Sequence, residues 1–165
     1  MAEMYNFSKP VLEAIAGRLQ KLRDDIAESI SRHGLTASGR TAQSLRVVVT
    51  PKEVALWGRA FFSALETGSS RWTGSTGIRC TFDEFRIIIR DWVQAKGLNF
   101  GQAREHERTI NAITAQIIRD GTAQKRSGQR LDVYTTLVDE AVEDCSNIMA
   151  NIVNANVKNV ISKWR

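Results

Sequence analysis

The sequence has little cysteine and histidine for its 165 residues. The two cysteines, Cys80 and Cys145, form no Cys-x-x-Cys or Cys/His spacing, which argues against a structural zinc site. They are best interpreted as small hydrophobic residues in a reducing compartment. The two histidines, His33 and His106, belong to no His-Glu-x-x-His motif, and both are expected to be surface residues.

Motifs for catalysis and nucleotide binding are also missing. There is no Walker loop, no dinucleotide-binding glycine pattern and no Gly-x-Ser-x-Gly elbow. Adjacent acids such as Asp24-Asp25, Asp83-Glu84 and Asp139-Glu140 diverge on a helix, so they do not share one catalytic face. We therefore expect no enzymatic activity, no cofactor and no bound metal.

Long hydrophobic runs are absent as well. The longest, such as Ile87-Ile88-Ile89, are far too short to span a bilayer. The first ten residues, MAEMYNFSKP, lack the apolar region and the cleavage pattern of a secretory signal. We expect a protein that is made and folded in a cytoplasm and has no membrane partner.

What is present is an ordinary globular composition with a basic balance. Hydrophobic residues make up 42% and charged residues 25% of the chain, which fits one domain over residues 1–165. The formal net charge of +5 is uneven, because residues 131–165 carry five acids and three bases. Such a balance permits contact with a polyanion without demanding it, and a solvated surface is the favoured interpretation.

The hydrophobic periodicity predicts an α+β domain. A β-hairpin or small antiparallel sheet should pack against about four helices, of which the N-terminal and C-terminal ones are long. The expected segments are an N-terminal helix in 1–34, a hairpin and short helix in 35–68, a flexible loop at 69–80 and a helical part at 81–165. Within these, helices are expected over about 9–33, 59–66, 81–96, 104–119 and 132–161, and strands over 44–50 and 54–57.

Two helices carry broad apolar stripes, and that of the helix after Thr81 is expected to be buried. The stripe of the helix after Thr81 comprises Phe85, Ile88, Ile89, Trp92 and Val93. The last helix has a stripe that runs from Val133 to Val160, beside a face rich in asparagine. Asparagine is a poor helix former, so tertiary or quaternary packing must support this segment. Packing on the chain's own body and packing along a neighbouring subunit both stay open.

The strongest positive feature is a group of large aromatic residues, Trp57, Phe61, Phe62 and Trp72. Adjacent Phe61 and Phe62 cannot easily both point into one core. Tryptophan and phenylalanine are also favoured at the centres of protein interfaces. Part of the group is therefore expected in the core and part in a protein interface.

The order of motifs over residues 38–140 resembles the tail-completion (head–tail joining, or neck) proteins of long-tailed phages. Ser38-Gly39-Arg40 leads through Ser44-Leu45 into the first strand, and Leu65-Glu66-Thr67-Gly68 precedes a variable loop. These are similar to small-Gly-x-Leu-x-x-Ser-Ile and Tyr-Ala-x-x-x-Glu-x-Gly-Thr in the family, with Phe61 in place of Tyr and Glu-Thr-Gly in place of Glu-x-Gly-Thr. Downstream, FRIIIRDWVQAKG and AITAQIIRDG resemble versions from phages of Bacteroidetes-type hosts.

The resemblance implies a non-enzymatic virion protein of the neck or tail-completion ring, which joins head to tail around the DNA channel. Its partners would be copies of itself, the portal or connector and the tail proteins. It would be located in the virion, and in the host cytoplasm during assembly. Neck ring and tail-terminator ring stay open, as does the ring's stoichiometry.

The resemblance also implies roles for individual residues. The subunit interface would hold Trp57, Phe61, Phe62, Glu66 and Trp72. The basic loop residues, which would face the DNA channel or an acidic neighbour, are Arg71, Arg79, Lys125, Arg126 and Arg130. The alternative function is a nucleic-acid-binding regulatory protein that uses the basic region 1–130, although no helix-turn-helix pattern stands out.

Overall fold

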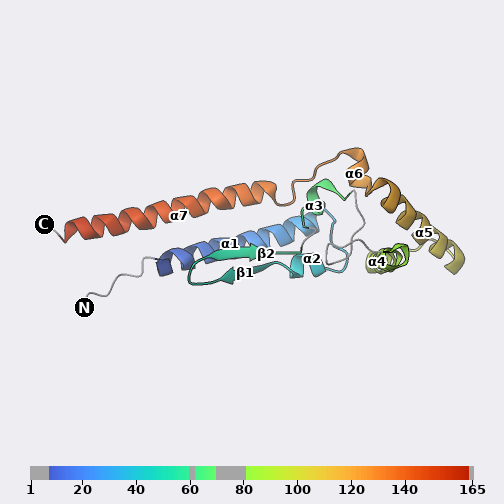
Figure 1. Ribbon diagram of the computed structural model, residues 1–165, viewed down its shortest axis with the longest axis horizontal. Helices are drawn as coiled ribbons and strands as arrows, with labels where there is room; N and C mark the ends of the chain where they lie inside the picture. Colours follow the sequence, from blue (N-terminus) through green and yellow to red (C-terminus); the bar gives the residue numbers. More distant parts are fainter. Residues whose placement is uncertain (1–7, 60–61, 70–80, 164–165) are drawn as a thin grey trace.

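A computed structural model has the predicted α+β architecture, in which helices predominate and two strands form one antiparallel sheet (Figure 1). The structure describes residues 8–59, 62–69 and 81–163. The predicted flexible loop at 69–80 lies almost wholly outside these residues. The elements are α1 (Ser8–Arg32), α2 (Arg40–Gln43), β1 (Arg46–Val49), β2 (Val54–Trp57), α3 (Ala64–Thr67), α4 (Phe82–Ala95), α5 (Ala103–Asp120), α6 (Ala123–Ser127) and α7 (Thr135–Ser162).

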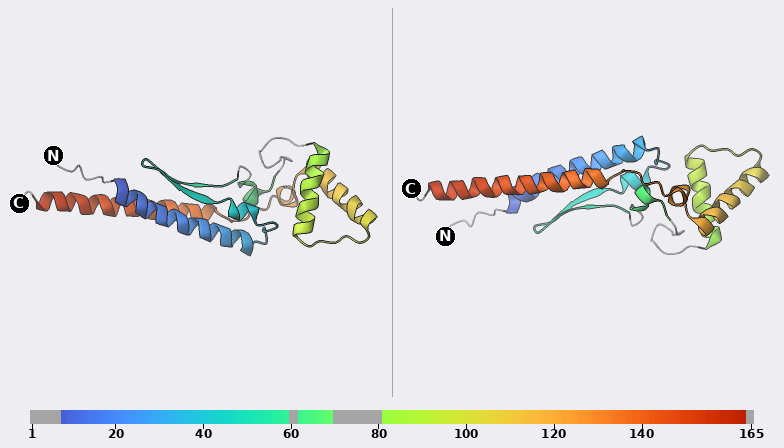
Figure 2. Two further views of the ribbon diagram at one scale, coloured as in Figure 1. Left: turned by 90° about the horizontal axis from the view of Figure 1, so that it is seen from below. Right: turned by 90° about the horizontal axis from the view of Figure 1, so that it is seen from above.

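The molecule is elongated, and its two longest helices lie side by side along the long axis (Figures 1 and 2). Helices α1 and α7 run antiparallel, and the β1–β2 hairpin packs on α1. Arg18 of α1 donates from Nε to Asp144 Oδ2 of α7 at 2.6 Å, which ties the two helices together. Helices α4 and α5 pack on each other at the opposite end of the molecule from the C-terminal end of α7.

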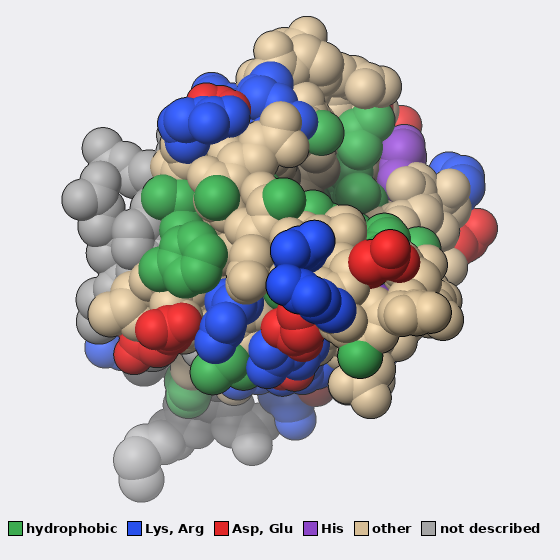
Figure 3. Space-filling view, turned by 90° about the vertical axis from the view of Figure 1, so that its right-hand side faces the viewer, with side chains coloured by type: hydrophobic (Ala, Val, Ile, Leu, Met, Phe, Trp, Pro, Cys, Tyr) green, Lys and Arg blue, Asp and Glu red, His purple; other side chains and the backbone are tan. Residues whose placement is uncertain are grey.

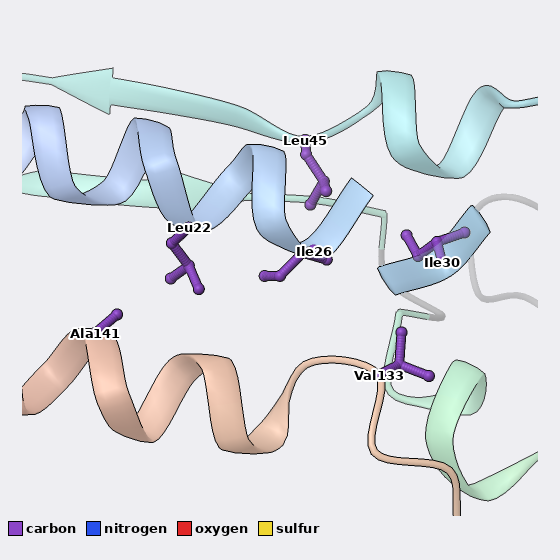
Figure 4. Close-up of a cluster of buried hydrophobic side chains, with 6 residues drawn as sticks. All are labelled: Leu22, Ile26, Ile30, Leu45, Val133 and Ala141. Carbon is purple, nitrogen blue, oxygen red and sulfur yellow. The ribbon is translucent and has the colours of Figure 1, made fainter. Parts of the chain in front are cut away.

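The main hydrophobic core lies where α1 meets the hairpin and the start of α7 (Figure 4). Leu22, Ile26 and Ile30 recur at four-residue steps, so one face of α1 is apolar over three turns. Leu45 enters this core from the segment before β1, and Val133 and Ala141 enter it from the α7 side. The predicted N-terminal helix over about 9–33 is confirmed.

A second, separate hydrophobic cluster holds α4 against α5. Phe85, Ile89 and Val93 of α4 are buried against Ile110 of α5, and Ile113 and Ile117 pack beside them. Arg90 forms a two-bond ion pair with Glu107 across the same helix pair, at 3.1 and 2.7 Å. The two helices therefore make a helical hairpin with a core of its own.

Local features of the sequence account for several helix boundaries. Thr81 and Glu84 form a capping box at the start of α4. Gly34 and Gly97 end α1 and α4 with φ of 66° and 65°, the left-handed conformation that favours glycine. The hairpin register pairs Arg46 with Trp57 and Val49 with Val54, as an antiparallel pair of the predicted strands requires.

Three boundaries differ from the prediction. The stretch 122–130, predicted as a loop, contains the short helix α6, which the hydroxyl of Thr122 caps by accepting from the Lys125 N–H. The last helix begins at Thr135, because Asp132 binds the N–H and the hydroxyl of Thr136 from outside the helix. Of the predicted helix over 59–66, the structure describes α3 at Ala64–Thr67, and residues 60 and 61 lie outside the described residues.

Candidate assembly surfaces

The Glu-Thr-Gly sequence at 66–68 anchors the middle of the chain to the start of α7. Glu66 is only 1% exposed, and its Oε1 accepts three backbone N–H groups, from Val133 at 3.0 Å and from Tyr134 and Thr135 at 2.8 Å each. Its Oε2 accepts the Thr135 hydroxyl at 2.6 Å. A carboxylate at this position satisfies the N–H groups that α7 itself cannot pair, and it complements the positive end of the helix dipole.

These bonds decide the charge state of Glu66. Burial by itself raises the pKa of this carboxyl group, since it disfavours the charged form. The hydroxyl of Thr135 and the backbone N–H groups of Tyr134, Thr135 and Val133 bind the ionised form and together hold the pKa below its usual range. Glu66 is therefore a buried anion whose partners belong to its own chain.

The subunit contact predicted for Glu66 stays a prediction, and within the chain this residue has a structural role. Its side chain is buried, and both carboxylate oxygens already accept hydrogen bonds from the segment before α7. The backbone of Glu66 is also engaged, because its carbonyl accepts the Leu131 N–H at 2.9 Å and the Gln124 side-chain amide at 2.5 Å. Glu66 therefore stabilises the fold of its own chain.

The next residues bring two distant parts of the chain together. Thr122 donates its N–H to the Ser69 carbonyl at 2.9 Å, and the Ser69 N–H is bound by the Thr122 hydroxyl at 3.0 Å. The chain thus leaves the main body after Ser69 and returns to it at Thr122, with α4 and α5 between them. Gly68 lies against the start of α6, so closely that a Cβ atom on it would lie 2.5 Å from Thr122 Oγ1 and 2.6 Å from Lys125 N.

The predicted aromatic interface residues separate into different environments. Trp57, at the end of β2, is 55% exposed and therefore presents a large apolar surface to solvent. Phe62 instead packs against the main core, with its ring centroid 5.1 Å from that of Tyr134. Phe61 and Trp72 lie outside the described residues. Of the group, Trp57 offers an exposed surface and Phe62 supports the core.

The basic residues around α6 are exposed, although two of them bind groups of their own chain. Arg126 donates to the Gly121 carbonyl at 2.7 Å. Arg130 donates to the Thr135 hydroxyl at 3.1 Å and lies 3.5 Å from Glu66 Oε2. Lys125 is exposed at the same place, so the three side chains form a small basic surface beside the start of α7. Arg71 and Arg79 lie outside the described residues.

The second half of α7 carries an exposed apolar face, for which the sequence left packing on the chain's own body and packing along a neighbouring subunit both open. Periodicity predicts one continuous apolar stripe from Val133 to Val160, but only the first part of this stripe packs against α1 and the hairpin. Beyond that part, the side chains lie 42–56% exposed. This apolar face comprises Met149, Val153, Val157, Val160 and Ile161. The asparagine-rich composition of the same stretch had pointed to a missing packing partner.

Helix α4 has further exposed apolar side chains outside the face that contacts α5. Ile88 and Trp92 were predicted to be buried, yet they are 41% and 40% exposed, and Ile87 beside them is 51% exposed. Trp92 and Ile88 also border a hollow of about 220 Å³ between α4 and the loop after α1. Figure 3 shows this end of the molecule, where hydrophobic side chains lie exposed among charged ones.

The groups that could perform chemistry serve structural roles in the described part of the chain. His33 contacts the Ser29 carbonyl through Nδ1 at 2.9 Å, and His106 Nδ1 accepts the Phe100 N–H at 3.3 Å. Burial raises the pKa of the Cys145 thiol, which favours the unreactive protonated form. Among the residues described, there is no group of three or more His, Cys, Asp or Glu side chains that could hold a metal ion.

The chain matches no protein-family model, no curated protein and no solved structure. Within the described residues, every helix is too short or too polar to cross a membrane. The exposed apolar faces on α4 and α7 are the surfaces that bear on its function, because large apolar side chains there have no partner within the described chain that covers them.

Proposed function

We propose that this chain is a non-enzymatic virion structural protein, a subunit of the neck or tail-completion ring that joins head to tail around the DNA channel. One observation carries the proposal: an elongated subunit leaves two large apolar helix faces exposed, one on α4 and one on α7. Soluble monomers rarely expose such contiguous patches unless the patches bind another protein. The collinear motifs over residues 38–140 supply the specific class.

One motif of the resemblance, Glu66-Thr67-Gly68, has a structural role that suits an assembly protein. Glu66 binds the start of α7, and Gly68 lies against Thr122 and Lys125, close to the point where the chain departs toward α4. A rigid junction of this kind holds two outward-facing helix surfaces in a fixed relation. Fixed geometry lowers the cost of ordering side chains and loops when subunits associate.

The acidic residues of the described chain support a structural role as well. Glu66, Glu84 and Asp132 bind backbone N–H groups near helix starts, and Glu107 pairs with Arg90. Carboxylates used in this way have low pKa values, which suits fixed anions and not general acids.

The experiment is a nonsense mutation of this gene in the phage that carries it, complemented by the intact gene on a plasmid. We expect DNA-filled heads and separate tails in electron micrographs, and infectious particles only when the plasmid is present. Joined, infectious particles formed without the protein would overturn the proposal. Antibodies against the chain should also label the junction between head and tail in wild-type particles.

Contact with DNA belongs to the same proposal, since a ring at this position surrounds the channel. The exposed basic surface of Lys125, Arg126 and Arg130 is the described part that would face it. Such contact would be weak, independent of sequence and steeply reduced between about 50 and about 200 mM salt. Tight, sequence-selective binding to duplex DNA would instead favour the alternative, a nucleic-acid-binding regulatory protein.

A further inference from the structure

The two exposed apolar faces differ in charge, and this difference indicates what covers them. After Asp144 every charged residue of the sequence is basic, namely Lys158, Lys163 and Arg165, and of these Lys158 lies on α7. Lys158 is exposed one residue from Val157. The apolar face of α7 therefore lies in a purely cationic stretch of the chain.

The exposed apolar side chains of α4, Ile87, Ile88 and Trp92, are here called its outer face, and the exposed charged residues of this helix are acidic. Among the charged residues of α4 itself, the exposed ones are acids, Asp83, Glu84 and Asp91, whereas Arg86 and Arg90 are half-buried. Those two arginines already form ion pairs with Asp83 and Glu107, at 3.3 and 2.7 Å. Arg40 and Arg59 of the neighbouring segments line the hollow that Asp91 also borders. Asp91 is a helical neighbour of Ile87 and Ile88, at positions i+4 and i+3, so an exposed carboxylate lies among the exposed apolar side chains.

We propose that the second half of α7 in one copy of the chain packs on the outer face of α4 in another copy. Valine and isoleucine side chains of α7 would cover Ile87, Ile88 and Trp92, and Lys158 would approach Asp91. The proposal names the subunit contact of the proposed ring and takes its biological setting from that function. Its test needs only the purified chain.

Charge also argues against the two symmetric alternatives. Two α7 faces packed on each other would bring only basic residues together, and two α4 faces would gather exposed acids. Like charges placed together at an interface disfavour that pairing, whereas opposite potentials steer the correct partners to each other. A contact between α7 and α4 is the pairing in which both the apolar faces and the charges match.

This contact joins two different surfaces at opposite ends of the subunit (Figure 1). Each copy that binds through its α7 face still has a free α4 face, so association continues from copy to copy. Head-to-tail contacts of this kind form a ring when the rotation closes and a filament when it does not.

The experiment uses two single variants of the full chain, each with a charge placed in one face. Val157→Glu alters the α7 face and Ile87→Glu alters the α4 face, at side chains that are 50% and 51% exposed, so folding should survive both. Val142→Glu is the matched control, because Val142 is 61% exposed on the same helix but outside the proposed contact. Circular dichroism verifies that all three fold.

Sedimentation velocity from about 1 µM to about 500 µM then measures association. We expect the wild type and Val142→Glu to form oligomers as concentration rises, and each face variant to need at least about tenfold more protein. Mixing the two face variants should give a one-to-one dimer that does not grow, because together they retain one intact α7 face and one intact α4 face. That dimer is the result specific to head-to-tail packing.

Three results would overturn the inference: a wild type that stays monomeric throughout, an Ile87→Glu variant that associates like the wild type, or a mixture that shows no dimer.

A charge exchange gives an independent check. Asp91→Lys and Lys158→Glu should each weaken association several-fold, and the chain with both changes should recover most of it. If purified protein fails here while the nonsense mutant still blocks head–tail joining, the contact is wrong and the proposed function stands.

Discussion

Glu66 shows how one buried charge can organise the centre of this protein. It is almost inaccessible to solvent, yet it is fully satisfied by backbone and hydroxyl donors from residues 133–135. A buried carboxylate is costly unless every oxygen is paired, so this arrangement fixes where α3 and the start of α7 meet.

Replacing Glu66 by Gln should therefore destabilise the fold strongly. The amide keeps the shape but removes the charge, and its NH2 group faces N–H donors that need an acceptor. We expect the free energy of unfolding to fall by about 1.5–3 kcal/mol, the range for a hydrogen bond to a charged group. Urea unfolding measures it, with Glu84→Gln as the control at an exposed helix cap, where a smaller loss is expected. Equal losses in both variants would contradict the role assigned to Glu66.

The same residue predicts a pH dependence. The pKa of Glu66 is lower in the folded chain than its ordinary value of about 4.3, so the ionised form is the one that folding favours. Its contribution to stability is complete above the ordinary value and is lost as pH falls through the folded pKa. Unfolding at a series of pH values below about 5 should show stability falling less steeply in Glu66→Gln than in the wild type. Parallel curves would argue against this assignment.

A second prediction concerns Gly68, where both the backbone conformation and the neighbouring atoms disfavour a side chain. Its φ is 68°, and an added Cβ would meet Thr122 Oγ1 at 2.5 Å and Lys125 N at 2.6 Å. Gly97 has a similar φ of 65° with nothing within 4 Å of such an atom. Gly97→Ala should cost about 1–2 kcal/mol from conformation alone, and Gly68→Ala clearly more because a backbone nitrogen must move. Thermal unfolding of the two variants distinguishes them.

At the scale of elements, the α4–α5 hairpin behaves as an insertion into the main body. It has its own hydrophobic cluster, and the chain leaves and returns through the paired residues Ser69 and Thr122. Besides the bonds between Ser69 and Thr122, Lys96 donates from Nζ to the Gly34 carbonyl at 2.6 Å, which links α4 to the end of α1.

Removing residues 70–121 and joining Ser69 to Thr122 through a short glycine linker should leave the main body folded. The core of Leu22, Ile26, Leu45 and Val133 contains no residue of α4 or α5. Far-UV circular dichroism and a cooperative thermal transition measure the outcome. A shortened chain without a cooperative transition would mean that the hairpin is required for folding of the rest.

The elements show what could be predicted from this sequence. Helix periods, the Thr81–Glu84 capping box and the glycines at helix ends are local features, and they placed most boundaries correctly. The apolar stripes of α4 and α7 were harder to interpret, because they extend around more of each helix than one neighbour covers. Periodicity identifies an apolar face but not the partner that covers it.

Glu66 shows that hydrogen bonds between residues far apart in the sequence could not be predicted from it. Its main-chain partner Val133 lies 67 positions along the sequence, and no local pattern indicates so distant a hydrogen bond. From the sequence, the residue was grouped with the aromatic residues near it, and its bonds to residues 133–135 were not predicted. Long-range polar contacts depend on tertiary packing, so they appear only with the fold.

At the scale of the whole molecule, stability and assembly should be separable. The main core ends before the last turns of α7, where Val157, Val160 and Ile161 stand half-exposed. Deleting residues 155–165 should therefore lower the melting temperature by only a few degrees, since little buried apolar surface is lost. Calorimetry measures this, and complementation of the nonsense mutant should fail with the shortened gene. A large drop in melting temperature would place these residues in the core instead.

The antiparallel pairing of α1 with α7 puts the start of one helix and the end of the other at the same end of the subunit (Figure 2). A purification tag or fluorescent fusion at the C terminus would therefore sit next to Val157 and Ile161 and mask that face. Gly128 is exposed, has φ of 69° and has open space around it, in the turn after α6. An epitope inserted there would allow particles to be labelled without obstructing either apolar face.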